Sequence, residues 1–212
     1  RVIMEEKKEM STEEIKMDND PKGEGKEKAS SPLREVLSWV VTLLAAFALA
    51  MVLKNYVIIN ATVPTGSMEH TIEPGDDLFG LRLAYQFSEP KRGDIVIFRF
   101  PDDETQKYVK RVIGLPGDVI DLRDNGDEED TIYSLYINGE LVKEDYIKAP
   151  MDTKGNIEYP YTVPENSYFV MGDNRNASSD SRRKSVGAIP KENLMGKVVF
   201  RLYPFSSIGF IK

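Results

Sequence analysis

A serine and a lysine are the side chains of this sequence best suited to covalent chemistry. Ser67 lies in the segment TGSM, and Lys110 lies in the segment YVKRVIGLPGD. The chain of 212 residues has no cysteine and one histidine, which excludes thiol nucleophiles and disfavours most histidine-based pairs. A neutral lysine can take the proton of a serine hydroxyl, and such pairs are a known variant of the catalytic triad. The sequence therefore indicates a serine nucleophile with a lysine base.

The residues around Lys110 predict a neutral amine. Val109, Val112 and Ile113 are apolar, and burial of a lysine among them would lower its pKa from about 10.4, because the charged form loses its hydration. An exposed lysine whose stem covers apolar surface is the alternative interpretation. A glycine before Ser67 allows a tight turn that presents a hydroxyl and a backbone N–H to one point.

A second polar segment follows later in the chain. It reads GDNRNASSDSR over residues 172–182 and concentrates hydroxyl, carboxylate and guanidinium groups. A network of such groups can orient a catalytic amine. The same composition is also typical of an exposed loop rich in turn residues.

A long apolar run precedes all of these segments. Val36 to Leu53 contains no charge, proline or glycine, and its 18 residues would form a helix of about 27 Å, close to the hydrocarbon thickness of a bilayer. We expect an uncleaved anchor helix at 36–54. A buried helix of a soluble protein would have a polar face at this length, and a signal peptide would have a shorter run nearer the N-terminus.

Basic residues predict the orientation of this anchor. Only Lys54 follows the run within twenty residues, whereas several basic residues precede it closely: Lys22, Lys26, Lys28 and Arg34. The positive-inside rule then places residues 1–35, a charged tail, in the cytoplasm and residues 56–212 outside. We expect a single-pass protein of the cell membrane that contacts lipid.

From Tyr56 onward the pattern changes to short β-rich runs separated by turn residues. Such runs lie at 94–100, 133–138, 168–171 and 197–203, and Asn138-Gly139 is a strong hairpin signal. The sequence predicts a mainly β domain. Residues 124–130, DNGDEED, are expected to form a solvated turn.

Composition excludes several other classes of function. The net charge is −7 and no basic stripe with interleaved aromatic residues occurs, which disfavours nucleic acid as a partner. Without cysteine the chain has no disulfide, zinc–thiolate site or iron–sulfur cluster.

Taken together, the motifs resemble the bacterial type I signal peptidases, the leader peptidase family. TGSM, GDDLF, KRGDIVIF, YVKRVIGLPGD and GDNRNASSDSR occur in the order of that family, from the apolar run to the C-terminal strand. The last two motifs are long and specific. The lysine at position 110 resembles the prokaryotic branch, because the branch of the endoplasmic reticulum has a histidine there.

The resemblance implies roles for individual residues. Ser67 would attack the scissile carbonyl, and Lys110 would act as general base and then protonate the leaving amine. The oxyanion would be held by the Ser67 N–H and the Thr65 hydroxyl. Supporting residues would be Ser178, which orients the lysine amine, and three residues that hold the surrounding loop: Asp173, Asp180 and Arg182, the last two as an ion pair. No metal or organic cofactor is implied.

The resemblance also implies an activity and a fold. The activity is that of a membrane-anchored serine endopeptidase, which cleaves N-terminal signal peptides from exported preproteins after small residues of the Ala-x-Ala type. The fold is a two-part β catalytic domain after one transmembrane helix, with an inserted β subdomain at about 121–161. Two alternatives stay open: a specialised relative that processes a few surface or pilus proteins, and an inactive membrane-tethered binding domain.

Three positions depart from the family. Thr65 stands where serine is common and keeps the hydroxyl, His70 stands where proline is usual, and Ala177 stands where asparagine is usual. His70 lies close enough to Ser67 in sequence to be considered as a base, but Lys110 has the more suitable surroundings.

Overall fold

The computed structural model describes residues 32–126 and 131–211, and the chain divides into two units, 1–43 and 44–212. The charged tail expected at 1–35 therefore lies outside the described residues up to position 31, as do residues 127–130 of the expected solvated turn. Helix α1 spans Pro32–Val52 and continues as a π-helical turn, η1 (Leu53–Val57).

Helix α1 is longer than the apolar run on which its prediction rests. It begins at Pro32 rather than at residue 36, because proline is favoured in the first turn of a helix, where its missing N–H costs nothing. All residues of α1 are exposed. By length and composition, Pro32–Val57 is one candidate membrane span among the described residues, with a mean hydropathy of 2.5 in its most apolar window.

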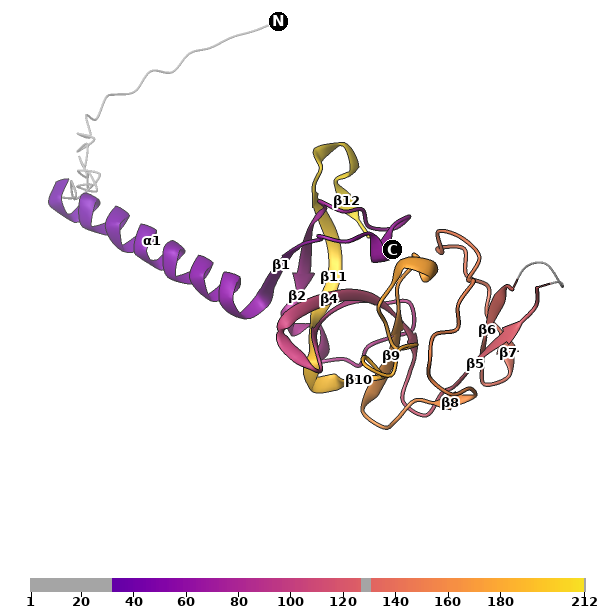
Figure 1. Cartoon of the computed structure of the whole chain (residues 1–212). Coiled ribbons are helices and arrows are strands. Elements are labelled where there is room, and N and C mark those ends of the chain that lie inside the picture. The colour runs from indigo at the N-terminus through magenta and orange to yellow at the C-terminus, as the bar shows by residue number, and fades with distance from the viewer. Residues whose placement is uncertain (1–31, 127–130, 212) are drawn as a thin grey trace, which may run out of the picture. The chain divides into compact units, whose positions relative to one another are not determined.

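The second unit contains an antiparallel sheet of eight strands (Figure 1). Seven strands run in the order β1-β2-β11-β3-β4-β9-β10, and β12 pairs with β11. The strands are β1 (Ile58–Thr62), β2 (Asp77–Leu81), β3 (Ile95–Phe100), β4 (Asp103–Gly114), β9 (Ser167–Met171), β10 (Ile189–Pro190), β11 (Leu194–Tyr203) and β12 (Gly209–Phe210). β-Bulges or irregularities interrupt the register of β4 against β3 between Arg99 and Phe100, and against β9 between Val112 and Gly114.

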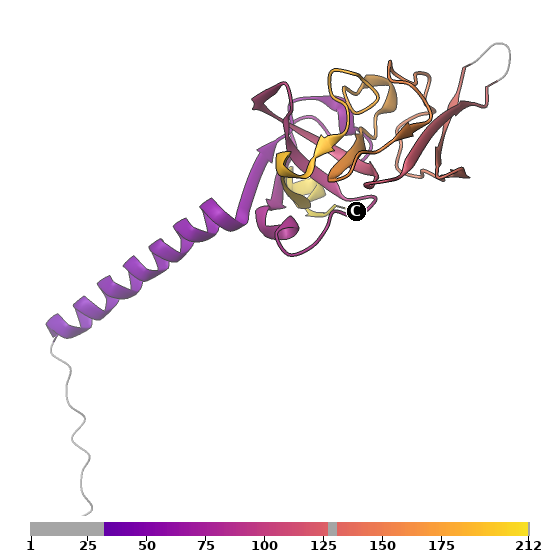
Figure 2. The same ribbon diagram turned by 90° about the horizontal axis from the view of Figure 1, so that it is seen from below.

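A smaller antiparallel sheet has the order β7-β6-β5-β8. Its strands are β5 (Val119–Asp124), β6 (Tyr133–Ile137), β7 (Glu140–Leu141) and β8 (Tyr161–Thr162). Asn138 and Gly139 connect β6 to β7 with positive φ angles of 53° and 86°, as the hairpin signal predicted. This sheet covers the segment for which an inserted subdomain was expected, and it lies beside the β9 end of the larger sheet (Figures 1 and 2).

Short 3-10 turns connect several strands. They are η2 (Gly66–Met68), η3 (Arg82–Tyr85), η4 (Arg175–Ala177), η5 (Lys191–Asn193) and η6 (Phe205–Ser207). Two of them, η2 and η4, carry parts of the polar motifs found in the sequence.

Three buried clusters hold the second unit together. One joins the two sheets, since it combines Ile113 and Phe169 of the larger sheet with Ile120 and Leu135 of the smaller one. A second packs around β1, β2 and β3 and includes Met68 of η2. The third lies around Val96, Phe98 and Val170.

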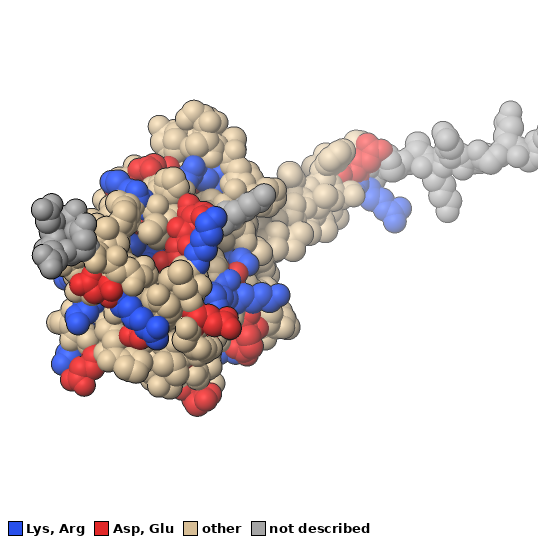
Figure 3. Space-filling view, turned by 90° about the vertical axis from the view of Figure 1, so that its right-hand side faces the viewer, with Lys and Arg blue, Asp and Glu red and all other residues tan. Residues whose placement is uncertain are grey.

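The predicted fold class is confirmed: the chain is mainly β after one N-terminal apolar helix. On the face shown in Figure 3, acidic and basic side chains are interspersed rather than separated. Such a mixed surface fits the sequence argument against nucleic acid as a partner.

Replacement of Phe169 by alanine should lower the free energy of unfolding by about 3–5 kcal/mol, because the ring is fully buried where the two sheets meet. Chemical unfolding of the full chain in detergent, followed by circular dichroism, measures the change. Phe87→Ala is the matched control, since that ring is 86% exposed and should change stability by less than about 0.5 kcal/mol. Equal losses in both variants would contradict a shared core at Phe169.

Candidate active site

Ser67 sits in the short turn η2, which the core holds in place. Thr65 precedes the turn with extended backbone angles (φ −128°, ψ 155°), and Met68 is completely buried in the cluster around β1, β2 and β3. The carboxylate of Glu69 folds back over Gly66, and a Cβ atom there would require this flexible side chain to move. The turn is therefore anchored on one side and closely packed on the other.

Lys110 lies on β4, opposite Val96 of β3, and reaches Ser67 directly. Its Nζ lies 2.6 Å from Ser67 Oγ and 2.9 Å from the carbonyl oxygen of Val109. Both side chains are buried, with exposed fractions of 4% for Lys110 and 8% for Ser67. The structure thus brings together the two residues that the sequence singled out.

Burial lowers the pKa of Lys110 from its ordinary value of 10.5 to about 8, although the negative charges of Asp180 and Asp173 oppose the shift. At pH 8 about half of these amines would be neutral. A neutral amine at 2.6 Å from a hydroxyl can accept its proton, and a base is most effective when its pKa is near the working pH. The geometry therefore suits a nucleophile–base pair.

A cavity of about 700 Å³ opens at this pair. The residues that line the cavity come from the Ser67 segment (60–65, 67 and 68), from β4 (106–110) and from the second polar motif (Ala177 and Ser179). Ile97 of β3 also lines it. Thr65 is exposed and lines this cavity together with Ser67 and Met68. Ile113, an apolar neighbour of Lys110 in the sequence, does not line this cavity and is part of the core between the sheets.

Two strand edges face the cavity without a partner strand. β1 is the edge of the larger sheet, and residues 106–110 of β4 pair with β3 on one side only, because pairing with β9 begins at Arg111. On the side without a partner strand, alternate backbone N–H and C=O groups can bond an extended peptide, apart from the Val109 carbonyl, which accepts from Lys110.

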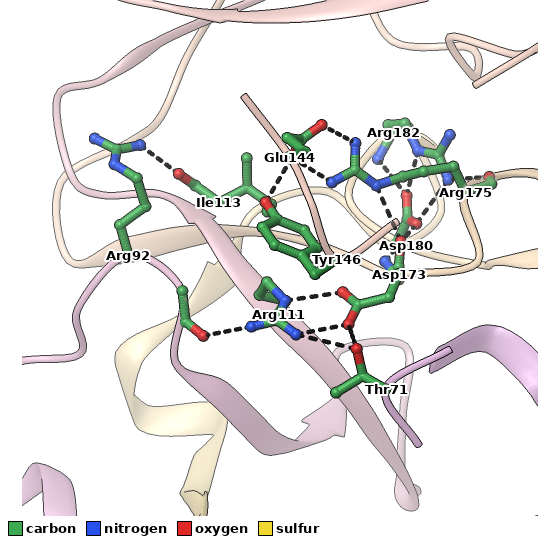
Figure 4. A network of polar contacts seen from close by, with 12 residues as sticks. Thr71, Arg92, Arg111, Ile113, Glu144, Tyr146, Asp173, Arg175, Asp180 and Arg182 are labelled. Carbon is green, nitrogen blue, oxygen red and sulfur yellow. Dashed lines mark hydrogen bonds and ion pairs between the residues drawn. The ribbon is translucent and has the colours of Figure 1, made fainter. Parts of the chain in front are cut away.

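Asp173 is held by a buried arginine that the sequence motifs did not single out. Arg111 donates to its two carboxylate oxygens at 2.9 Å and 2.7 Å, and both side chains are at most 4% exposed. Thr71, four residues after the nucleophile, donates to the same carboxylate at 2.5 Å (Figure 4). Asp173 thus links β4 to the segment that carries Ser67.

Asp180 and Arg182 form the buried ion pair that the family resemblance implied. Arg182 donates to both carboxylate oxygens at 2.8 Å, and the backbone N–H of Gly172 donates to one of them at 3.0 Å. Burial alone would raise the pKa of Asp180, but the hydrogen bonds and charge of Arg182 outweigh it and lower this pKa below its usual value. The carboxylate therefore stays ionised beside the lysine.

Ser178 is placed near the pair but does not bond it in this structure. Its hydroxyl is buried and makes no hydrogen bond of good geometry within residues 32–126 and 131–211, although it lies close enough to Asp180 to help lower the pKa of that carboxyl. Gly172 packs against both the Ser178 side chain and the Ser67 carbonyl, so closely that no Cβ atom fits there. The orientation of the Lys110 amine by Ser178 stays a prediction.

Other polar residues at the site had no signal in the sequence. Arg175 forms a buried ion pair with Glu144, and Arg111 lies 4.2 Å over the ring of Tyr146 (Figure 4). Both Glu144 and Tyr146 follow strand β7 in a stretch without a recognisable motif, so only the folded chain reveals them. His70 lines a separate cavity beside Tyr146, away from the one that contains Ser67 and Lys110.

Within the described ranges, 32–126 and 131–211, no three acidic or histidine side chains gather in a way that could hold a metal ion.

Comparison with known proteins identifies the family to which this chain is related. The family described as "Signal peptidase, peptidase S26" matches residues 36–203. The chain is similar to a probable signal peptidase I-2 from Synechocystis (34% identity, 88% of this chain and 82% of the relative) and to a signal peptidase I from Bacillus licheniformis (35% identity, 86% and 96%). A signal peptidase I crystal structure from Enterococcus faecalis is 32% identical, with 52% of this chain and 97% of that chain covered and a TM-score of 0.39.

The amine of Lys110 should titrate near pH 8, well below an ordinary lysine at 10.5, because it is desolvated. Nitrogen-15 NMR of lysine side chains in the full chain in detergent would follow this titration. The Lys110→Arg variant assigns the signal, since the signal should vanish there. A titration near the ordinary value would contradict a buried amine.

Proposed function

This chain belongs to the signal peptidase family, peptidase S26, and we propose that it cleaves N-terminal signal peptides from exported preproteins as a serine endopeptidase. The observation that carries the proposal is the 2.6 Å contact between the Ser67 hydroxyl and the buried Lys110 amine. Burial that lowers the pKa of Lys110 to about 8 supplies the neutral base that such chemistry requires.

The proposed reaction has two stages. The Ser67 oxygen attacks the scissile carbonyl carbon while its proton moves to the Lys110 amine. The resulting ammonium then protonates the leaving nitrogen as the C–N bond breaks, which leaves an acyl-enzyme. Water attacks this ester with Lys110 again as base, and Ser67 regains its proton.

The oxyanion of each tetrahedral intermediate needs donors that are already in place. The backbone N–H of Ser67 lies in the first turn of η2, where N–H groups lack partners within the helix. The hydroxyl of Thr65 lines the same wall of the cavity. We assign both to the oxyanion hole, where loss of one donor typically costs about 10²–10³ in rate.

Asp173, Asp180, Arg182 and Ser178 support this pair. The two carboxylates are ion-paired with buried arginines, so their charges oppose only part of the desolvation of Lys110. Ser178 packs on Gly172 beside the Ser67 carbonyl. After a small rotation of its side chain, its hydroxyl would bond the Lys110 amine and orient it.

The substrate is proposed to bind as an extended strand. The outer edges of β1 and of residues 106–110, which have no partner strand, offer backbone hydrogen bonds to such a peptide. In a strand, alternate side chains point the same way, so the first and third residues before the cut face the same wall. Ala61, Val63, Met68 and Ile97 line the cavity, which suits small apolar residues in an Ala-x-Ala pattern.

The proposed location follows from the N-terminal helix. Residues 36–54 would anchor the chain in the cell membrane in contact with lipid, residues 1–35 would form a cytoplasmic tail, and residues 56–212 would lie outside with the inserted subdomain at about 121–161. The apolar, uncharged stretch within Pro32–Val57 supports the anchor, and the basic residues before it support the orientation.

Ser67→Ala and Lys110→Ala should each reduce cleavage by at least about a thousandfold, because each removes one member of the reacting pair. Cleavage of a model preprotein with an Ala-x-Ala site in detergent, with mass spectrometry of the products, measures this. Ser88→Ala, a change at an exposed serine, serves as the control. A cut that survives in Ser67→Ala would overturn the mechanism. No cut by the wild type would favour a narrow-specificity relative or an inactive binding domain.

The pH dependence of cleavage should follow the titration of Lys110. Its pKa of about 8 means that the base is protonated below this pH and neutral above it. kcat/KM should therefore fall about tenfold per pH unit below pH 8 and level off above it. Lys110→Arg should be inactive at every pH, because arginine stays charged. A flat profile down to pH 6 would point to another base.

A further inference from the structure

Two backbone carbonyls of η2, those of Gly66 and Ser67, are held by one residue of the second polar motif. Asn174 donates through its backbone N–H to the carbonyl of Ser67 at 3.1 Å, and through Nδ2 to the carbonyl of Gly66 at 2.9 Å. Asn174 is 8% exposed, so these bonds are shielded from water. Because both carbonyls belong to η2, a shift of Asn174 moves Ser67.

Asn174 is itself held by a carboxylate from the nucleophile segment. Its Nδ2 also donates to Glu69 Oε2 at 3.1 Å, and the Glu69 side chain folds over Gly66. The same Oε2 atom accepts from the amine of Lys148. Lys148, Glu69, Asn174 and Gly66 thus form a continuous polar chain that ends at the turn carrying the nucleophile.

Lys148 comes from a part of the sequence with no role in the reaction so far. It lies in the connection between β7 and β8 of the smaller sheet, and its backbone N–H donates to the carbonyl of Asp173 at 3.0 Å. Tyr146, two residues earlier, packs under Arg111 and donates to Glu144 at 2.6 Å. Burial raises the pKa of Tyr146 above its ordinary value, which keeps this hydroxyl protonated.

We propose that Lys148 and Glu69 are positioning residues for Ser67, so that the β7–β8 connection of the smaller sheet sets the geometry of the nucleophile. This inference rests on the proposed function of the Ser67–Lys110 pair, and it gives the smaller sheet a part in the chemical step. Neither residue touches the reacting atoms. They act through Asn174 and the backbone of η2.

The size of the effect follows from the position of this chain. Lys148 is 49% exposed and Glu69 24%, so their ion pair adds little to overall stability. Its effect is local, because a displacement of reacting atoms by about 1 Å can cost about a hundredfold in rate. For a partial loss of constraint on η2, we expect about a tenfold decrease in kcat.

The test compares Lys148→Met with Lys143→Met in the full chain in detergent. Both remove one ammonium from the same connection, but Lys143 is 86% exposed and pairs only with Asp145 on the surface. Lys148→Met should lower kcat about tenfold with little change in KM or in thermal stability, whereas Lys143→Met should match the wild type. Lys148→Arg should restore most of the rate.

A double-mutant cycle with Glu69→Gln adds a second criterion. If the two residues act as one unit, Lys148→Met should have little further effect on kcat in the Glu69→Gln background. Additive losses would overturn the proposal, as would an unchanged kcat in Lys148→Met, a change confined to KM, or an equal loss in Lys143→Met.

NMR of the backbone amides tests the influence of Lys148 on η2 independently of cleavage activity. The backbone amide signals of Gly66, Ser67 and Asn174 should shift in Lys148→Met and stay in place in Lys143→Met. If the wild type cleaves no preprotein, the proposed function fails, but these chemical shifts still show whether Lys148 influences the backbone of η2. If the wild type cleaves and the shifts are absent, the positioning role is overturned.

Discussion

The interaction on which the site depends is the contact between the Lys110 amine and the Ser67 hydroxyl, because it requires a neutral lysine in the presence of two buried carboxylates. Uncompensated, Asp173 and Asp180 would favour the ammonium form strongly. Each is instead matched with its own guanidinium, Arg111 and Arg182. The carboxylates stay charged, and their ion pairs hold residues 172–182 in place. The two guanidinium groups offset most of the negative potential that the carboxylates create at the Lys110 amine. Desolvation then determines the protonation state of Lys110.

This arrangement explains why the polar groups come from distant parts of the chain. Strand β4 supplies Lys110 and the arginine beside it, η2 supplies Ser67, and residues 172–182 supply the carboxylates. The smaller sheet closes the network through Glu144 and Arg175 (Figure 4). Buried polar networks of this kind are stable only when nearly every member has a partner. The apolar cluster between the sheets keeps those partners at hydrogen-bonding distance.

Sequence alone predicted the parts of this picture that depend on local pattern. The mainly β fold follows from short runs and turn residues, and the Ser67–Lys110 pair follows from residue types and apolar neighbours. The Lys148 contact could not be predicted, because a lysine after β7 carries no local signal and its partner lies 79 positions away. Arg111 lies within one of the sequence motifs, but the sequence assigned it no role, because its ion pair with Asp173 exists only in the folded chain. The bond expected between Ser178 and Lys110 depends on a side-chain rotation that no pattern specifies.

The two neighbouring cations on β4 have a consequence for folding. Lys110 and Arg111 occupy successive positions. A slip of this strand by one residue in one direction would place the permanently charged guanidinium of Arg111 against Ser67, and a slip in the other direction would leave the carboxylate of Asp173 facing the lysine and Ser67 facing a valine. Such a chain would resemble the native fold in its sheet yet be inert. The irregularities between Arg99 and Phe100 and between Val112 and Gly114 bracket the pair. Bulges of this kind fix strand register, so here they exclude registers of the same sheet in which Ser67 and Lys110 do not meet.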